Sequence, residues 1–244
     1  MAEPLYNDAR IASFYDLENR WAPDFDLCTA LADGAGSVLD LGCGTGELAA
    51  ALAPGRRVVG VDPAPAMLAI AASRPGGGAV TWIEGDARKL SLGGTFELVL
   101  LTGHAFQVFL TEADQLAVLK TIRDHLAPGG QFIFDTRNAA LQPWEHWQKN
   151  DRKRLTHPEL GPVTIWTETT FDAARSVARY VKHFHIESTG QTLSAPSEIR
   201  FDDQPHIADV LARSGLAPTR WLGDWYGTDW RPDSPEIIPV GTLG

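Results

Sequence analysis

The chain has only two cysteines, Cys28 and Cys43, among 244 residues. Two cysteines cannot build a disulfide framework, and neither has a second cysteine at the spacing of a metal site. The first residues lack the basic and apolar regions of a signal peptide. No apolar run reaches the roughly 18 residues that span a membrane. We therefore expect a reduced, cytoplasmic protein with no membrane segment.

Basic residues are also few. The chain has 21 Lys and Arg against 31 Asp and Glu, which gives a formal net charge of −10. Such a balance offers no general attraction for nucleic-acid backbones or anionic membrane surfaces. One basic cluster at 149–154 fits either a phosphate contact or a solvated loop. The charge therefore argues against nucleic acid as a partner.

The remaining composition is that of a globular protein, with 44% hydrophobic and 21% charged residues. A chain of this length buries roughly 70% of its extended surface, enough for a core without disulfides. Its length corresponds to between one and two domains of about 150 residues. Eight tryptophans are unevenly distributed, since six of them follow residue 140.

Short apolar strands alternate with helices up to residue 135. The expected strands are 37–41, 57–62, 80–84, 96–101 and 131–135, and the expected helices are 47–53, 65–72 and 112–126. This alternation predicts a parallel sheet that is covered on both faces. Ligands of such sheets bind at the carboxyl ends of the strands, so the loops after these strands should share one rim.

The pattern changes after residue 135. Three segments alternate between apolar and polar residues with a period of two, which predicts an antiparallel meander with one solvated face. A helix and two final strands should follow, although Pro239 is unusual inside a strand. The segments are 163–171, 177–186 and 194–201 for the meander, 205–214 for the helix, and 219–222 and 236–240 for the last strands.

Three alternating glycines end the motif Val38–Gly46, between a strand and a helix. Glycines allow a tight turn and let backbone amides approach a ligand, and the helix N-terminus adds free N–H groups. A dinucleotide fingerprint fits only in a shifted register, from Gly44 to Ala49. That register leaves Asp40 and Gly42 without a role, so we reject it.

The pattern Asp40-x-Gly-x-Gly-x-Gly46 resembles motif I of the class I S-adenosylmethionine-dependent methyltransferases. Four further segments resemble family motifs in the expected order: 59–62, 85–87, 96–102 and 126–134. The match covers roughly residues 30–138. It implies an α/β fold, a doubly wound, seven-stranded, mostly parallel Rossmann-like sheet into which the antiparallel β-meander is inserted.

The resemblance also implies a division of the chain. Residues 1–138 and 202–244 would form the cofactor domain, with cap helices in 1–30, and residues 139–201 an inserted meander subdomain. The meander resembles the lid or dimer-forming sheet of small-molecule methyltransferases, so a homodimer through it is a further expectation. The late tryptophans suit a substrate wall, an interface or an ordinary core.

The family resemblance assigns cofactor roles to several residues. Asp40 would orient the glycine loop and approach the methionine amine, although it could instead cap the following helix. Asp62 would hold the ribose hydroxyls and Asp86 the exocyclic amine of adenine. Met67 would back the adenine ring or belong to the core, and Cys43 is a small spacer, not a nucleophile. The other expected contacts are Tyr15, Gly42, Gly44, Gly46, Pro63, Ala87 and Thr102.

The residues after the fourth strand should face the methyl acceptor. His104 is the candidate general base, because an imidazole titrates near physiological pH; packing over the cofactor is the alternative. Arg137 could hold an anionic substrate group or pair with an acid. The other candidate substrate residues are Phe106, Gln107 and Trp225.

Two features of related enzymes are absent at this point. The D/N-P-P-Y/F sequence of nucleobase amine methyltransferases is missing, and Thr102 stands where metal-dependent catechol-type enzymes carry an acid. We therefore expect no metal. The sequence predicts an S-adenosylmethionine-dependent enzyme that methylates an N or O atom of a small metabolite by in-line displacement. A tRNA or protein methyltransferase is an alternative, as is a non-catalytic cofactor-binding subunit, against which the intact glycines and acids argue.

Overall fold

The computed structural model describes residues 4–147 and 152–244. Its main sheet has the order β11-β12-β5-β4-β1-β2-β3, with a short β6 paired to β12. The five strands β1 to β5 are parallel to one another, and β12 is antiparallel to both of its neighbours, β5 and β11. The predicted seven-stranded, mostly parallel sheet is confirmed, with β6 added. The strands are β1 (Ser37–Leu41), β2 (Arg57–Asp62), β3 (Thr81–Glu84), β4 (Phe96–Leu101), β5 (Leu126–Phe134), β6 (Thr136–Arg137), β11 (Leu216–Leu222) and β12 (Glu236–Leu243).

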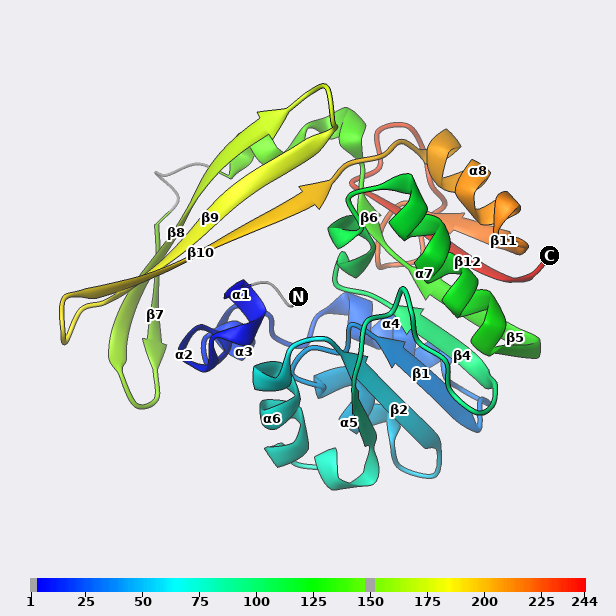
Figure 1. The fold of residues 1–244 in the computed structure, drawn as a ribbon, viewed down its shortest axis with the longest axis horizontal. Coiled ribbons are helices and arrows are strands. Elements are labelled where there is room, and N and C mark those ends of the chain that lie inside the picture. The colour runs from blue at the N-terminus through cyan, green and yellow to red at the C-terminus, as the bar shows by residue number, and fades with distance from the viewer. Residues whose placement is uncertain (1–3, 148–151) are drawn as a thin grey trace.

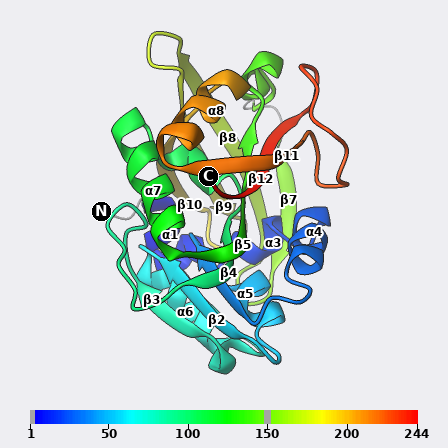
Figure 2. The ribbon, with the colours of Figure 1, turned by 90° about the vertical axis from the view of Figure 1, so that its right-hand side faces the viewer.

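Helices cover both faces of this sheet (Figure 2). On one face, α7 (Glu112–His125) and α8 (Gln204–Arg213) bury apolar side chains against the strands, and α4 (Pro23–Leu31) and α5 (Glu47–Leu52) do so on the other. Helix α6 (Pro65–Ser73) follows β2. Thr111 caps α7, as its side chain accepts from the Asp114 N–H. Within the described residues, no helix is long and apolar enough to cross a membrane.

Two prolines lie inside strands. Pro128 belongs to β5, which begins directly after α7 at residue 126, not at residue 131 as the sequence predicts. The pairing of β5 with β4 is irregular there, since the register shifts between Phe96 and Leu98. Pro239 lies inside β12, opposite Trp221. On its other side β12 pairs with β6 only up to residue 237 and with β5 only from residue 240. The missing N–H of Pro239 therefore falls between two ladders, where it is tolerated.

A second, four-stranded antiparallel sheet, β10-β9-β8-β7, forms what we call the roof (Figure 1). Strands β8 (Gly161–Asp172), β9 (Val177–Ile186) and β10 (Gln191–Arg200) match the expected meander. The sequence does not predict strand β7 (Lys153–His157), because Leu155 is its only aliphatic side chain. In the basic cluster, Arg154 pairs with Glu187 on the roof, and residues 149–151 lie outside the described residues.

Three short N-terminal helices lie between the roof and the main sheet (Figure 1). They are α1 (Pro4–Asn7), α2 (Ala9–Ala12) and α3 (Tyr15–Glu18). Leu5, Ile11 and Phe14 pack against the inward-facing side chains of the roof. The Phe14 ring stacks on Phe184 of β9 with 4.9 Å between centroids. The N-terminus thus joins the two sheets.

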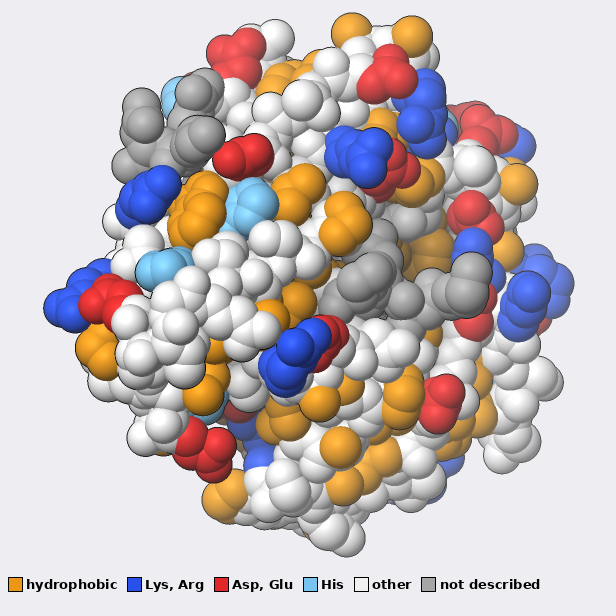
Figure 3. Space-filling view, turned by 60° about the vertical axis from the view of Figure 1, so that its left-hand side comes forward, with side chains coloured by type: hydrophobic (Ala, Val, Ile, Leu, Met, Phe, Trp, Pro, Cys, Tyr) orange, Lys and Arg blue, Asp and Glu red, His pale blue; other side chains and the backbone are white. Residues whose placement is uncertain are grey.

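An aromatic cluster supports the other end of the roof. Trp144, in the 3₁₀ helix Pro143–His146, stacks on Phe171 of β8 at 3.8 Å, and Trp147 packs against Tyr180 and Phe201. Two of the late tryptophans therefore attach the roof to the chain that leads into it. The roof side of the molecule shows hydrophobic, acidic, basic and His side chains intermixed (Figure 3). The homodimer through this sheet stays a prediction.

Candidate active site

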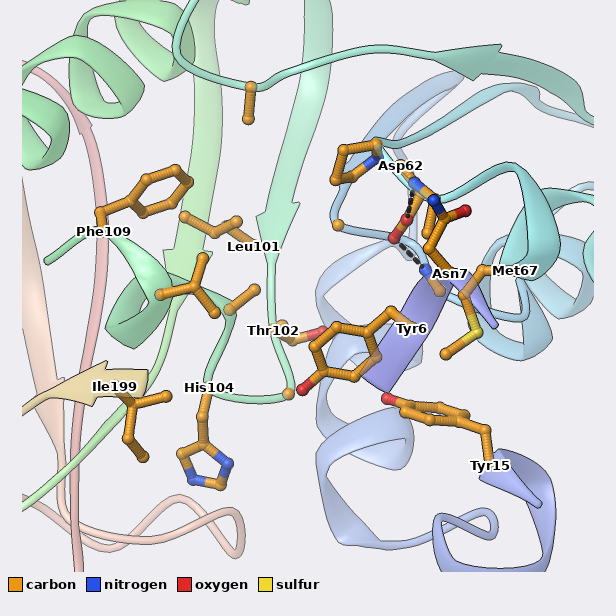
Figure 4. A pocket seen from close by; sticks show the side chains of 18 of the residues that line it. Tyr6, Asn7, Tyr15, Asp62, Met67, Leu101, Thr102, His104, Phe109 and Ile199 are labelled. Atoms are coloured by element: carbon orange, nitrogen blue, oxygen red, sulfur yellow. Dashed lines mark hydrogen bonds between the residues drawn. The ribbon is translucent and has the colours of Figure 1, made fainter. Parts of the chain in front are cut away.

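A cavity of about 950 Å³ lies where the main sheet, the N-terminal helices and the roof meet (Figure 4). Its walls include the loops that follow β1, β2, β3 and β4, as the rule for parallel sheets predicts. A second cavity of about 420 Å³ adjoins it and shares wall residues that include Tyr15, Thr102, His104 and Arg137. Together the two cavities form the candidate site.

The glycine loop supplies one wall. Gly44 has a φ of 54° and lines the larger cavity, where a Cβ would stand 3.8 Å from the Tyr15 ring. Gly46 lines neither cavity; a Cβ there would lie 2.3 Å from Trp82, so its role is close packing. Cys43 lines the smaller cavity, and burial raises the pKa of its thiol well above the usual range. The thiol therefore stays neutral, as a spacer would.

Asp62 is fixed at the end of β2 by two backbone groups. Its Oδ1 accepts from the Ala64 N–H at 2.8 Å and its Oδ2 from the Gly44 N–H at 2.9 Å (Figure 4). These bonds join the loops after β1 and β2 and leave lone pairs for two vicinal hydroxyls. Asp40 is buried in β1 and lines the smaller cavity. Burial, together with the charge of Asp62, raises the pKa of Asp40 to about 7.

Asp16 holds the N-terminal helices onto the glycine loop. Its Oδ1 accepts from the Thr45 hydroxyl at 2.6 Å, and its Oδ2 pairs with Arg74 at 3.0 Å. Arg74 also donates to the Thr45 carbonyl. This arrangement places Tyr15 against both cavities, where burial raises the pKa of its hydroxyl and keeps it protonated.

The wall of the larger cavity also holds the expected adenine-binding residues. Asp86 lies in its wall with both carboxylate oxygens hydrogen-bonded by Arg88, which lowers the Asp86 pKa. Met67 is both a cavity residue and a core residue, since it packs against Ala12. The other predicted cofactor residues in this wall are Gly42, Pro63, Ala87 and Thr102.

These residues fit S-adenosylmethionine on three grounds. The larger cavity is at the upper end of the 300–1,000 Å³ typical of small-molecule sites. The Asp62 carboxylate can accept hydrogen bonds from the two ribose hydroxyls. The smaller cavity has more acidic than basic side chains in its wall, which suits a ligand with an ammonium and a sulfonium group: Glu18, Asp24, Asp40, Glu47 and Asp135 against Arg20, Arg137 and Lys182.

His104 is held between two carboxylates at the junction of the cavities. Its Nε2 lies 3.2 Å from Oδ2 of Asp135 and 3.1 Å from Oε1 of Glu236. Its backbone N–H donates to Asp135 as well, at 3.0 Å, in a loop where His104 takes a left-handed φ of 61°. A non-glycine residue in that conformation persists only when its surroundings enforce it. Burial raises the pKa of Asp135 to about 6.

Among the described residues, His104, Asp135 and Glu236 are the group that could hold a cation, since their ligand atoms lie within 4.8 Å of one another. The absence of a metal stays a prediction. Asp135 ends a buried strand as Asp40 and Asp62 do, and that shared pattern could have identified it. Glu236 carries no such signal, because it begins an antiparallel strand far along the chain.

Two of the four predicted substrate residues line a cavity and two do not. Phe106 stacks on Phe134 at 4.5 Å in the core, and neither it nor the buried Gln107 lines a cavity. Both therefore lie behind the site instead of facing the acceptor, because their side chains in the 3₁₀ helix Ala105–Val108 contact Phe134 and the Arg200 carbonyl. Arg137 lines both cavities, and Trp225 lines the smaller one.

The roof and the N-terminus contribute three residues that the sequence did not indicate, Tyr6, Ile199 and Lys182. Tyr6 meets the predicted Tyr15 edge to face at 6.4 Å on one side of the larger cavity, and Ile199 of β10 lies on the His104 side (Figure 4). Lys182 of β9 reaches the junction and pairs with Glu18 of α3 at 2.8 Å. Side chains from an antiparallel sheet thus complete a site built on parallel strands.

The chain is similar to known methyltransferases over its whole length. A family described as a methyltransferase domain matches residues 38–130. The cypemycin N-terminal methyltransferase of Streptomyces sp. is 30% identical and is covered over 98% of both chains. Among solved structures, the CcbJ methyltransferase from Streptomyces caelestis superposes with a TM-score of 0.82 at 23% identity, and the amino pentose methyltransferase CalS10 from Micromonospora echinaspora with 0.70 at 24%, each covering 100% of both chains.

Proposed function

The chain belongs to the S-adenosylmethionine-dependent methyltransferases, and we propose that it transfers the methyl group to the nitrogen of an amine. The observation that carries the proposal is the position of His104 between Asp135 and Glu236, at the junction of the two cavities. The N-terminal methyltransferase to which the chain is similar supports an amine acceptor.

The charge of this cluster favours an amine over a hydroxyl. Two carboxylates attract a protonated amine and stabilise the imidazolium that forms when His104 takes its proton. A hydroxyl acceptor would develop negative charge beside the same carboxylates, which is unfavourable. Carboxylates accept hydrogen bonds and, when ionised, offer no donor to a forming alkoxide.

The hydrogen bonds also define which nitrogen acts. Because Nε2 faces carboxylate oxygens, the proton of the neutral imidazole resides on Nε2. Nδ1 then carries the lone pair, and we assign it the role of proton acceptor. When bound, S-adenosylmethionine supplies a methyl group on a positively charged sulfur, which a neutral amine attacks without further activation. The protein contributes deprotonation and positioning.

The test uses S-adenosylmethionine with a heavy-isotope methyl group and paired acceptors that differ only in amine or hydroxyl, together with a short peptide that has a free N-terminus. Mass spectrometry should find the label on nitrogen. His104→Gln, which keeps a hydrogen-bonding side chain but no base, should lower kcat by roughly 10²- to 10⁴-fold. Cofactor affinity, measured by calorimetry, should change little.

His185→Gln is the matched control, because His185 is bonded to Thr192 on the roof and lines neither cavity. Its rate should equal that of the wild type, and EDTA should have no effect. Label found only on oxygen, or a wild-type rate in His104→Gln, would refute the proposal.

A further inference from the structure

Arg137 is a cation at the centre of an acidic site. It is a wall residue of both cavities, as is His104. Within residues 4–147 and 152–244 its guanidinium forms no ion pair with a carboxylate, and the neighbouring acids Asp135 and Glu236 are bonded to His104. Burial raises the pKa of Asp135 and the charge of Arg137 partly offsets that rise, so the two groups interact. No carboxylate of the described residues hydrogen-bonds the guanidinium, however, so the N–H groups that Gln107 does not engage are open to an anion.

The guanidinium is also held in place. Its Nη1 donates to Gln107 Oε1 at 2.9 Å, and Gln107 is in turn fixed through its Nε2 to the Arg200 carbonyl at 2.9 Å. The face of the guanidinium lies 5.1 Å from the Trp147 ring. Gln107 is buried, so its role is to position Arg137. A planar guanidinium with a fixed orientation is the group best suited to bind a carboxylate or phosphate.

The strand register places Arg137 next to the cluster that we propose to bind the amine. Asp135 and Arg137 are two residues apart along one extended segment, so they point to the same side. Glu236 of β12 is the direct antiparallel partner of Arg137, and such partners have Cβ atoms about 5 Å apart. A positive group and a negative cluster thus lie side by side on one wall.

We infer that the methyl acceptor carries an oxyanion, a carboxylate or a phosphate, a few bonds from its amine, and that Arg137 binds this oxyanion. The inference rests on the proposed function, since it takes the amine as the methylated group. Asp135 and Glu236 face the ammonium, and Arg137 faces the anion, so the site selects a zwitterion in one orientation.

The test compares acceptors that differ only in the anion. L-Alanine is paired with L-alaninamide, and phosphoethanolamine with ethanolamine, so the two arms separate a carboxylate from a phosphate. Wild-type kcat/KM should favour the charged member of one pair by roughly 10- to 100-fold, the effect of a charge-assisted hydrogen bond. Arg137→Gln should abolish that preference through KM, and Arg137→Lys should restore part of it.

Arg220→Gln is the matched control, because Arg220 is exposed and lines neither cavity; it should keep the preference. Equal rates for charged and neutral acceptors, or a preference that survives in Arg137→Gln, would overturn the inference while the proposed function stands.

A binding measurement tests the inference separately. If no amine is methylated, the proposed function is refuted, but the binding of an anion by Arg137 can still be measured. Trp147 packs on Arg137, so titration with acetate or inorganic phosphate should change tryptophan fluorescence in the wild type and not in Arg137→Gln. A wild type that binds neither anion would contradict the inference.

Discussion

The rim of the main sheet and the roof build the same site in different ways. On the rim, Asp40, Asp62 and Asp135 each stand where a buried parallel strand ends, and backbone groups orient two of them. The roof contributes Thr167, Tyr180 and Lys182 from within its strands, where successive side chains point alternately to the two faces of the sheet. The rim is therefore rigid and specified by local sequence, whereas the roof depends on what it packs against.

The first prediction, with the largest effect, concerns the attachment of the roof. Phe14 is fully buried and stacks on Phe184, so Phe14→Ala should lower the free energy of unfolding by about 3–5 kcal/mol. Urea unfolding measures the loss, and hydrogen exchange should show that amide protection falls mainly in β8 and β9. Phe106→Ala, in the main-sheet core, is the control and should expose β4 and β5 instead. Identical exchange patterns would mean that the two regions unfold as one unit.

The second prediction concerns the buried acid of the rim. The pKa of Asp40 is about 7 in the folded protein, against an ordinary value of 3.8. The folded state therefore binds more protons between these values, and stability from this group is greatest below pH 4 and is lost as the pH rises through 7. The loss is of the order of 4 kcal/mol.

Asp40→Asn should remove this slope, which thermal unfolding of the cofactor-free protein between pH 4 and 8 measures as a difference from the wild type. Asp233→Asn, at an exposed loop position, is the control and should follow the wild-type curve. An unchanged slope in Asp40→Asn would show that the buried carboxyl is not the group that titrates.

The third and smallest effect is expected at the contact between the two regions. Glu18 and Lys182 pair with side-chain exposures of only 15% and 24%, so Glu18→Gln should cost about 1 kcal/mol of stability and weaken cofactor binding slightly. Glu112→Gln breaks an equivalent pair with Arg213, whose side chains are both 46% exposed, and should cost less than about 0.5 kcal/mol. Equal costs in thermal unfolding would show that burial adds nothing to this contact.

Local sequence determined the parallel sheet, its rim and most of the cofactor wall. The strand from residue 57 to 62 and the helix after Thr111 follow from apolar runs, caps and glycines, which act over a few residues. Asp40 and Asp62 were assigned through the resemblance of their short motifs, 40–46 and 59–62, to those of class I methyltransferases. The meander was visible from the residues alone, since alternation with a period of two is a local property.

Only the tertiary structure decided which side chains face the acceptor. The inward turn of Phe106 and Gln107, the pairing of Glu236 with Arg137, and the seating of Phe14 under the roof each depend on segments far apart in the chain. No local pattern encodes a contact between distant strands. The sequence thus identified a cofactor site, and the packing of the roof, β6 and β12 around it created the acceptor site.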